Sequence, residues 1–197
     1  MTLANWLTSV RLLLSPVFVL VFLQEGLWAR IAALAIVVVS ELTDAFDGHL
    51  ARSRGEVTDF GKLLDPLADS VSRISVFVAF LVQGLIPWWM LVVFIYRDSL
   101  ISTMRTVCAY RGEVVAARSS GKIKAIIQAT AIITILVGRI ASALFPSLLP
   151  EPLLNQIAWW LVLVAAVYTF YSLYEYLSAN WDIVSSAGRG KPRREAA

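Results

Sequence analysis

The sequence contains very little cysteine and histidine, with one of each, Cys108 and His49, in 197 residues. A single cysteine excludes a disulfide within the chain and says little about the redox compartment. We interpret Cys108 as a small apolar helix residue and His49 as a bystander. The sequence also lacks long Gly-, Ser- or Pro-rich linkers and internal repeats. We therefore expect one domain over residues 1–185, followed by a basic, disordered tail at 186–197.

Apolar residues make up 58% of the chain, and the mean hydropathy is +0.73. This composition predicts a polytopic membrane protein rather than a soluble domain. The first apolar run lacks a basic leader and a convincing cleavage site, which favours a retained helix over a signal peptide. We expect an all-α fold of six transmembrane helices, at residues 6–23, 30–53, 59–83, 88–110, 121–144 and 153–177.

Four aspartates lie within twenty-six residues, between two apolar runs: Asp44, Asp47, Asp65 and Asp69. The first pair is three residues apart and the second pair four, so each pair shares one face of a helix. Carboxylates in such surroundings are costly unless cations pair with them, which makes the cluster a functional-site hypothesis. Mg²⁺ or Mn²⁺ suits hard oxygen ligands. The spacing therefore predicts a divalent metal site where the two helices meet.

Other residues around the cluster extend this prediction. Gly48 and Gly61 have no side chain, so a ligand or a helix backbone can approach closely. Arg52 can neutralise a phosphate. Two residues have two interpretations each: Glu41 either supports the cluster or packs against an arginine, and Arg73 pairs either with the aspartate one turn before it or with a phosphate.

The most basic interior segment is 111–124, which has a single acidic residue and four cationic ones: Arg111, Arg118, Lys122 and Lys124. One interpretation is a solvated basic loop. The other is a phosphate-binding corner at Gly121, where we expect the fifth helix to begin, because helix N-termini attract anions.

The fourth predicted helix places Arg97, Asp98 and Arg105 in an apolar frame. One interpretation is an internal ion-pair network; the other is that Arg105 faces a polar cavity and holds an anion. The positive-inside rule favours both termini in the cytoplasm, since the connections after the second and fourth helices and the tail carry most cations. The aspartate cluster would then open toward the cytoplasm.

The spacing Asp-x2-Asp-Gly-x2-Ala-Arg-x8-Gly-x3-Asp-x3-Asp resembles the signature of the CDP-alcohol phosphatidyltransferase family. Every fixed position is present: Asp44, Asp47, Gly48, Ala51, Arg52, Gly61, Asp65 and Asp69. The resemblance implies an enzyme of the bacterial inner membrane that transfers the phosphatidyl group of CDP-diacylglycerol to an alcohol and releases CMP. It also implies a homodimer in the lipid bilayer, with no nucleic-acid partner. The segment 118–124 is similar to members that use sn-glycerol 3-phosphate as the acceptor.

The resemblance assigns roles to individual residues. It implies that Asp44, Asp47, Asp65 and Asp69 hold Mg²⁺ or Mn²⁺, and that Asp69 is also the general base. The implied CDP-binding residues are Asp44, Gly48, Ala51 and Arg52, with Asn5 and Thr8. The spacing Asn-x2-Thr-x2-Arg, formed by Asn5, Thr8 and Arg11, resembles bacterial members of the family but also suits a capping and interface segment. For the acceptor's phosphate we expect Arg105, Arg118 and Lys122.

Other functions remain open at this point. Within the family, the acceptor could instead be inositol phosphate, serine, or phosphatidylglycerol in a cardiolipin synthase. From another class, an ion transporter would also place aspartates in a membrane. A transporter predicts carboxylates on several separated helices and needs no adjoining glycines. Here the four aspartates lie on two consecutive predicted helices beside glycines, which favours the enzyme.

Overall fold

The computed structural model describes residues 3–54, 59–110 and 118–181, and the side chains within 6–44, 64–108 and 118–181. Over these residues it contains six α-helices and no strand, which confirms the all-α prediction. The helices are α1 (Leu3–Phe22), α2 (Leu27–Arg54), α3 (Asp59–Val82), α4 (Trp88–Tyr110), α5 (Ser119–Leu144) and α6 (Glu151–Ala179). Helices α1 and α2 each begin three residues earlier than predicted, and two other helices begin two residues earlier. Helix α5 begins at Ser119 rather than Gly121, and α6 begins after Pro150, whose extended backbone suits a helix cap.

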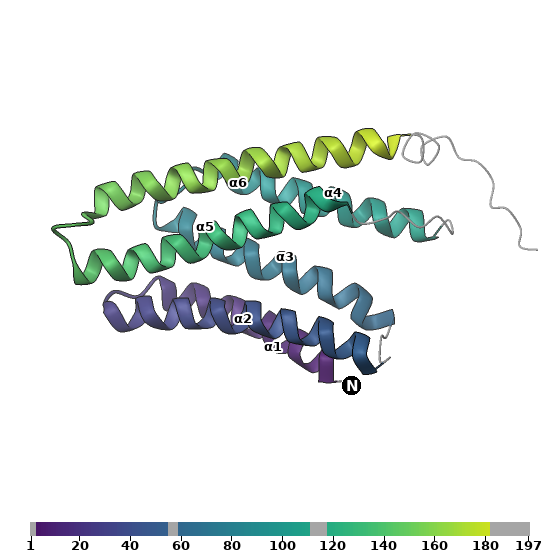
Figure 1. Cartoon of the computed structure of the whole chain (residues 1–197), viewed down its shortest axis with the longest axis horizontal. Helices are drawn as coiled ribbons and strands as arrows, with labels where there is room; N and C mark the ends of the chain where they lie inside the picture. Colours follow the sequence, from purple (N-terminus) through teal and green to yellow (C-terminus); the bar gives the residue numbers. More distant parts are fainter. Residues whose placement is uncertain (1–2, 55–58, 111–117, 182–197) are drawn as a thin grey trace, which may run out of the picture.

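The helices run up and down, so alternate connections lie at opposite ends of the bundle (Figure 1). Helices α1, α2 and α3 pack together, and α6 packs on α4 and α5. The two groups join where α2 meets α5 and where α3 meets α4. Two connections use glycine in the left-handed region, Gly26 at φ +104° and Gly84 at φ +71°, where other residues are strained. Helix α1 begins at the end of the bundle where α2, α4 and α6 end.

The core draws on all six helices and includes a cluster of aromatic rings between α1, α3 and α4. Phe18, Phe77, Phe80 and Phe94 are almost completely buried, and the ring centroids of Phe77 and Phe94 are 4.3 Å apart. These residues lie toward the end of the bundle opposite the aspartates. The polar residues of the predicted site therefore lie at one end of the bundle, and the other end is a packed apolar core.

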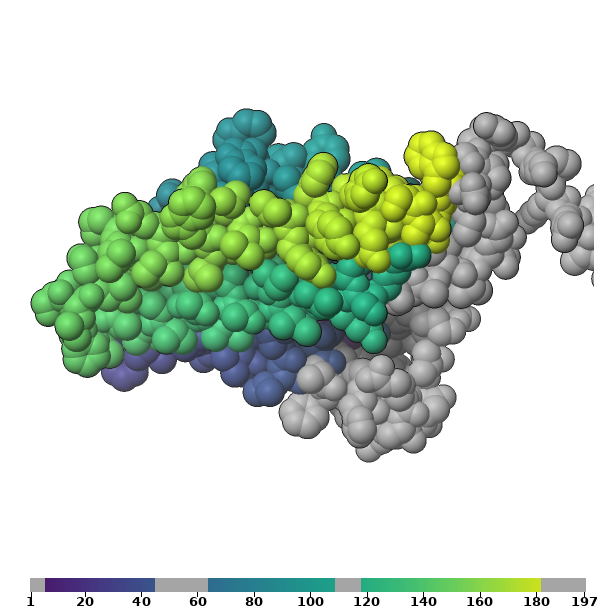
Figure 2. Space-filling view, turned by 45° about the horizontal axis from the view of Figure 1, so that its top comes forward, coloured from purple at the N-terminus to yellow at the C-terminus, as the bar shows by residue number. Residues whose placement is uncertain are grey.

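The outer surface is apolar as well, as expected for a protein surrounded by lipid. Helices α5 and α6 lie side by side across one face (Figure 2), and large side chains of α6 are exposed there, including Val164, Val167 and Phe170. Among the described residues, α5 and α6 are long and apolar enough to cross a membrane. Exposed apolar patches of this extent are rare on soluble monomers, so the surface has the character of an integral membrane protein.

Candidate functional site

Helix α1 contacts three of the four predicted metal-binding aspartates. Arg11 Nη1 pairs with Asp44 Oδ1 of α2 and lies 4.0 Å from Asp69 Oδ1 of α3. One turn earlier, the Thr8 hydroxyl donates a hydrogen bond of 2.9 Å to Asp65 Oδ1. Thr8 and Arg11 are 0% and 2% exposed. One buried face of α1 thus holds carboxylates from two other helices near one another.

The contact of Arg11 with the aspartates is not evident from the sequence, although Arg11 ends the Asn-x2-Thr-x2-Arg spacing noted above. Thr8 and Arg11 are three residues apart, which predicts a shared helix face. Nothing in the sequence, however, says that this face meets the aspartates rather than the membrane interface. The structure places the buried Thr8 hydroxyl against Asp65. The contact of Thr8 with the nucleotide stays a prediction.

Asp69 has a second cationic neighbour. Arg73 Nη2 donates a hydrogen bond of 2.8 Å to Asp69 Oδ1, one helical turn away. This contact confirms the interpretation that Arg73 pairs with the preceding aspartate. The Asp69 side chain is still 38% exposed, so it is oriented by arginines and remains accessible.

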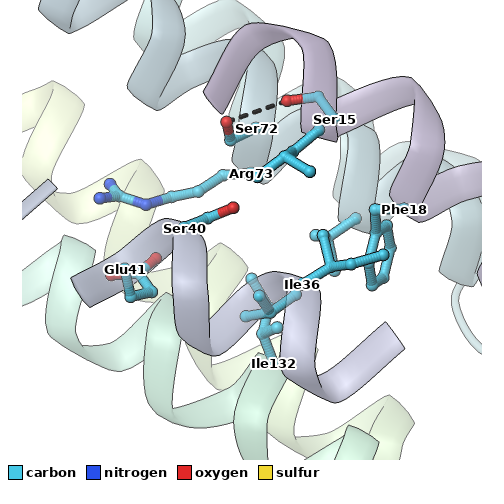
Figure 3. Close-up of a pocket in the computed structure, with 11 residues that line it drawn as sticks. Ser15, Phe18, Ile36, Ser40, Glu41, Ser72, Arg73 and Ile132 are labelled. Atoms are coloured by element: carbon cyan, nitrogen blue, oxygen red, sulfur yellow. Dashed lines mark hydrogen bonds between the residues drawn. The ribbon is translucent and has the colours of Figure 1, made fainter. Parts of the chain in front are cut away.

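A small cavity that Arg73 helps to line lies between α1, α2, α3 and α5 (Figure 3). Its volume is about 30 Å³, which is room for about one water molecule. Arg73 and Glu41 both line it. So do Ser15 and Ser72, whose hydroxyl oxygens are 3.0 Å apart. Glu41 therefore shares a cavity wall with the arginine that orients Asp69.

In front of the aspartates lies a much larger cavity, of about 680 Å³. Its acidic wall includes Asp44 and Asp69 from α2 and α3. Its other walls, from α3, α4 and α5, carry six cationic side chains: Arg73, Arg97, Arg105, Arg118, Lys122 and Lys124. All three residues predicted to bind the acceptor's phosphate thus line the same cavity as the aspartates. Residues from four helices form one chamber with an acidic and a basic side.

The basic side is built on a buried ion-pair network. Asp98 Oδ1 accepts hydrogen bonds of 2.7 Å from Lys124 Nζ and 2.9 Å from Arg97 Nη1. A Cβ atom on Gly121 would lie only 3.2 Å from Arg97 Nη2, so the glycine lets α5 approach this arginine. The network interpretation of Arg97 and Asp98 is confirmed. Lys124, one of the cations of the predicted basic segment, is 3% exposed and belongs to the network rather than to a solvated loop.

Substitution of Asp98 tests how much this network contributes to the stability of the folded protein. Asp98→Asn leaves the buried Lys124 ammonium without its anion, so we expect destabilisation by about 3 kcal/mol. Thermal unfolding of the purified protein in detergent would measure it. The control is Glu151→Gln, which breaks the Arg30–Glu151 pair at the opposite end of the bundle. Because Glu151 is exposed, its loss should cost less than about 1 kcal/mol. Equal unfolding temperatures for Asp98→Asn and wild type would contradict the prediction.

Several predicted site residues have side chains outside the described part of the chain: Asn5, Asp47, Gly48, Ala51, Arg52 and Gly61. Among the side chains that are described, no group of three Asp, Glu, His or Cys residues is arranged as a metal site. Arg11 nevertheless lies against carboxylates from two helices, so this is a place where opposed acidic groups accommodate positive charge. Carboxylate oxygens are also the donor type that hard divalent ions prefer.

Comparison with known proteins places this geometry in context. A sequence model of the family described as CDP-alcohol phosphatidyltransferase matches residues 1–171. A Bacillus subtilis protein named CDP-diacylglycerol–glycerol-3-phosphate 3-phosphatidyltransferase is 35% identical over 94% of this chain and 98% of its own. A protein of the same name from Yersinia pestis (strain Pestoides F) is 33% identical over 90% of this chain and 94% of its own. A probable phosphatidylglycerophosphate synthase of Mycobacterium tuberculosis is 39% identical over 66% of this chain and 63% of its own.

Proposed function

The chain belongs to the CDP-alcohol phosphatidyltransferase family, and we propose that it transfers the phosphatidyl group of CDP-diacylglycerol to sn-glycerol 3-phosphate. The products are phosphatidylglycerophosphate and CMP. The observation that supports the acceptor is the lining of the cavity. Asp69 and Asp98 pair with Arg73, Arg97 and Lys124, and the lining carries Arg105, Arg118 and Lys122 in addition. A diphosphate held by divalent ions at the aspartates leaves these three cations for an acceptor that brings its own phosphate. The names of the similar proteins agree with this acceptor.

In this proposal the acidic side holds Mg²⁺ or Mn²⁺ through Asp44, Asp47, Asp65 and Asp69. Two observations support the fit of these residues to a divalent ion. Carboxylates of α2 and α3 already lie around one cationic group, the Arg11 guanidinium. Their oxygen atoms are the donor type that such ions prefer. Bound divalent ions supply charge that polarises the phosphorus and stabilises the departing CMP. Thr8 and Arg11 hold the carboxylates in place from behind.

Asp69 is the proposed general base. The acceptor's hydroxyl oxygen bonds to the phosphatidyl phosphorus, the anhydride bond to CMP breaks, and the hydroxyl proton passes to the Asp69 carboxylate. Arg73 orients that carboxylate through its hydrogen bond of 2.8 Å. Because Asp69 lines the cavity together with the basic side chains, an acceptor held by its phosphate can present a hydroxyl to it.

The acceptor's phosphate would bind to Arg105, Arg118 and Lys122. Arg118 is the residue before the first turn of α5, so backbone N–H groups of that turn add favourable charge for an anion. The CDP moiety would contact Asp44, Gly48, Ala51 and Arg52, with Asn5 and Thr8 of α1. Thr8 also donates a hydrogen bond to Asp65, so it would position that carboxylate as well.

The arrangement of the chain in the membrane follows from the same proposal. Six helices cross the bacterial inner membrane, and both termini and the cavity face the cytoplasm, where the polar substrates are. The orientation is supported by the position of the cavity, which lies at the end of the bundle where α1 begins and α6 ends. The transmembrane domain comprises residues 1–185, the basic tail 186–197, and the working unit is a homodimer.

A panel of acceptors tests the proposed function. Purified protein in detergent micelles receives CDP-diacylglycerol and a divalent ion, and CMP release is followed with each acceptor. We expect glycerol 3-phosphate to give a kcat/KM at least about 100-fold above those of inositol phosphate, serine and phosphatidylglycerol, because a built polar site rejects analogues strongly. Faster CMP release with any of these other acceptors would refute the assignment of the acceptor.

A further inference from the structure

One face of α6 contacts three of the arginines that line the cavity. Ser172, Glu175 and Tyr176 stand at i, i+3 and i+4, so they share a face of the helix. None of the three lines the cavity. We call these three residues the α6 platform. The sequence gives no sign of it, because α6 otherwise has the composition of an ordinary membrane span.

Each member of the platform meets a different arginine. Arg118 Nη1 donates a hydrogen bond of 3.0 Å to Glu175 Oε1. The Arg105 guanidinium carbon lies 5.8 Å from the centre of the Tyr176 ring, within the range of a cation–π contact. Arg97 Nη2 donates a hydrogen bond of 3.2 Å to Ser172 Oγ. Arg97 and Arg105 lie on α4 and Arg118 directly precedes α5, and α6 packs on both of these helices.

The burial of the platform matches a supporting role. Ser172 and Tyr176 are 1% and 3% exposed and the Glu175 side chain is 30% exposed, whereas the Arg118 side chain is 39% exposed. The arginines therefore have one part fixed against α6 and another part accessible from the cavity. Arginine has many rotamers, and a binding site gains affinity when they are restricted before the ligand arrives.

We propose that Glu175 and Tyr176 are positioning residues that set the affinity for the phosphorylated acceptor through Arg118 and Arg105. This inference rests on the proposed function, since it takes these two arginines as the acceptor's phosphate site. Glu175 holds the Arg118 fork while leaving other N–H groups free for an anion, because a guanidinium has five donors. The Tyr176 ring supports the Arg105 guanidinium from one side.

The test compares KM for the two substrates. For Glu175→Gln and Tyr176→Leu we expect KM for glycerol 3-phosphate to rise roughly fivefold or more, with kcat and KM for CDP-diacylglycerol within about twofold of wild type. Tyr176→Phe keeps the aromatic ring, so its KM for glycerol 3-phosphate should equal that of the wild type. The matched control is Tyr174→Leu, which removes an exposed ring two residues away and should change neither constant.

A double variant separates positioning from general destabilisation. If Glu175 acts through Arg118, then adding Glu175→Gln to Arg118→Gln should change KM for glycerol 3-phosphate by less than about twofold. An undiminished effect in that background would overturn the inference, as would an equal rise in KM for both substrates. Wild-type protein without CMP release on addition of glycerol 3-phosphate would instead refute the proposed function. Elution of each variant in detergent by size-exclusion chromatography identifies any that fails to fold, and Glu175→Asp then replaces Glu175→Gln, with a smaller rise expected.

Discussion

Asp69→Asn is expected to lower kcat at least about 1000-fold. A general base contributes roughly 100- to 10,000-fold, and the same substitution also removes an anionic ligand from the proposed metal site. The amide has nearly the same size as the carboxylate and can still accept the hydrogen bond from Arg73, so the helices should remain packed. The measurement is CMP release by the purified variant at saturating concentrations of both substrates.

The control for Asp69→Asn is Glu25→Gln, which removes an acidic group from an exposed position at the opposite end of the bundle. We expect this variant to keep the wild-type rate. A rate for Asp69→Asn above about one tenth of wild type would exclude a role as general base, because the loss would then be smaller than proton transfer to a carboxylate provides.

Removal of divalent ions is the second change with a large expected effect. Excess EDTA should reduce CMP release to less than about 1% of its starting rate, because a charged phosphoanhydride would then meet the carboxylates of α2 and α3 without neutralisation. Addition of Mg²⁺ or Mn²⁺ beyond the chelator should restore the rate. The Asp65→Asn variant should need a higher ion concentration to recover its rate of CMP release, since it lacks one proposed metal ligand. Activity that persists unchanged in EDTA would refute the metal proposal.

The helices and the acidic cluster were predictable because their signals are local. Apolar runs predict helices wherever they occur, and the aspartates of α2 and α3 follow one another closely in the chain. The boundaries were less exact: α5 begins at Ser119 rather than Gly121. That difference moves Arg118 to the residue before the helix, which is where a phosphate-binding cation is most useful.

The supporting contacts could not be predicted because they join residues far apart in sequence. Thr8 and Asp65 are 57 residues apart, and so are Arg118 and Glu175. No sequence pattern predicts that Thr8 contacts Asp65 or that Glu175 contacts Arg118. Lys124 also looked like any other cation of its basic segment, and only its contact with Asp98 of α4 shows that it is buried in an ion pair. The sequence thus predicts which residues carry the chemistry, while the structure shows which side chains contact several of them.

Glycerol 3-phosphate labelled in its glycerol carbons tests the central proposal most directly. The wild-type protein, CDP-diacylglycerol and a divalent ion are supplied, and label in the lipid extract is compared with CMP released. If the acidic and basic sides of the cavity hold the two substrates of one reaction, label should enter the lipid in a one-to-one ratio with CMP. Release of CMP while the label stays in the aqueous phase would contradict the account.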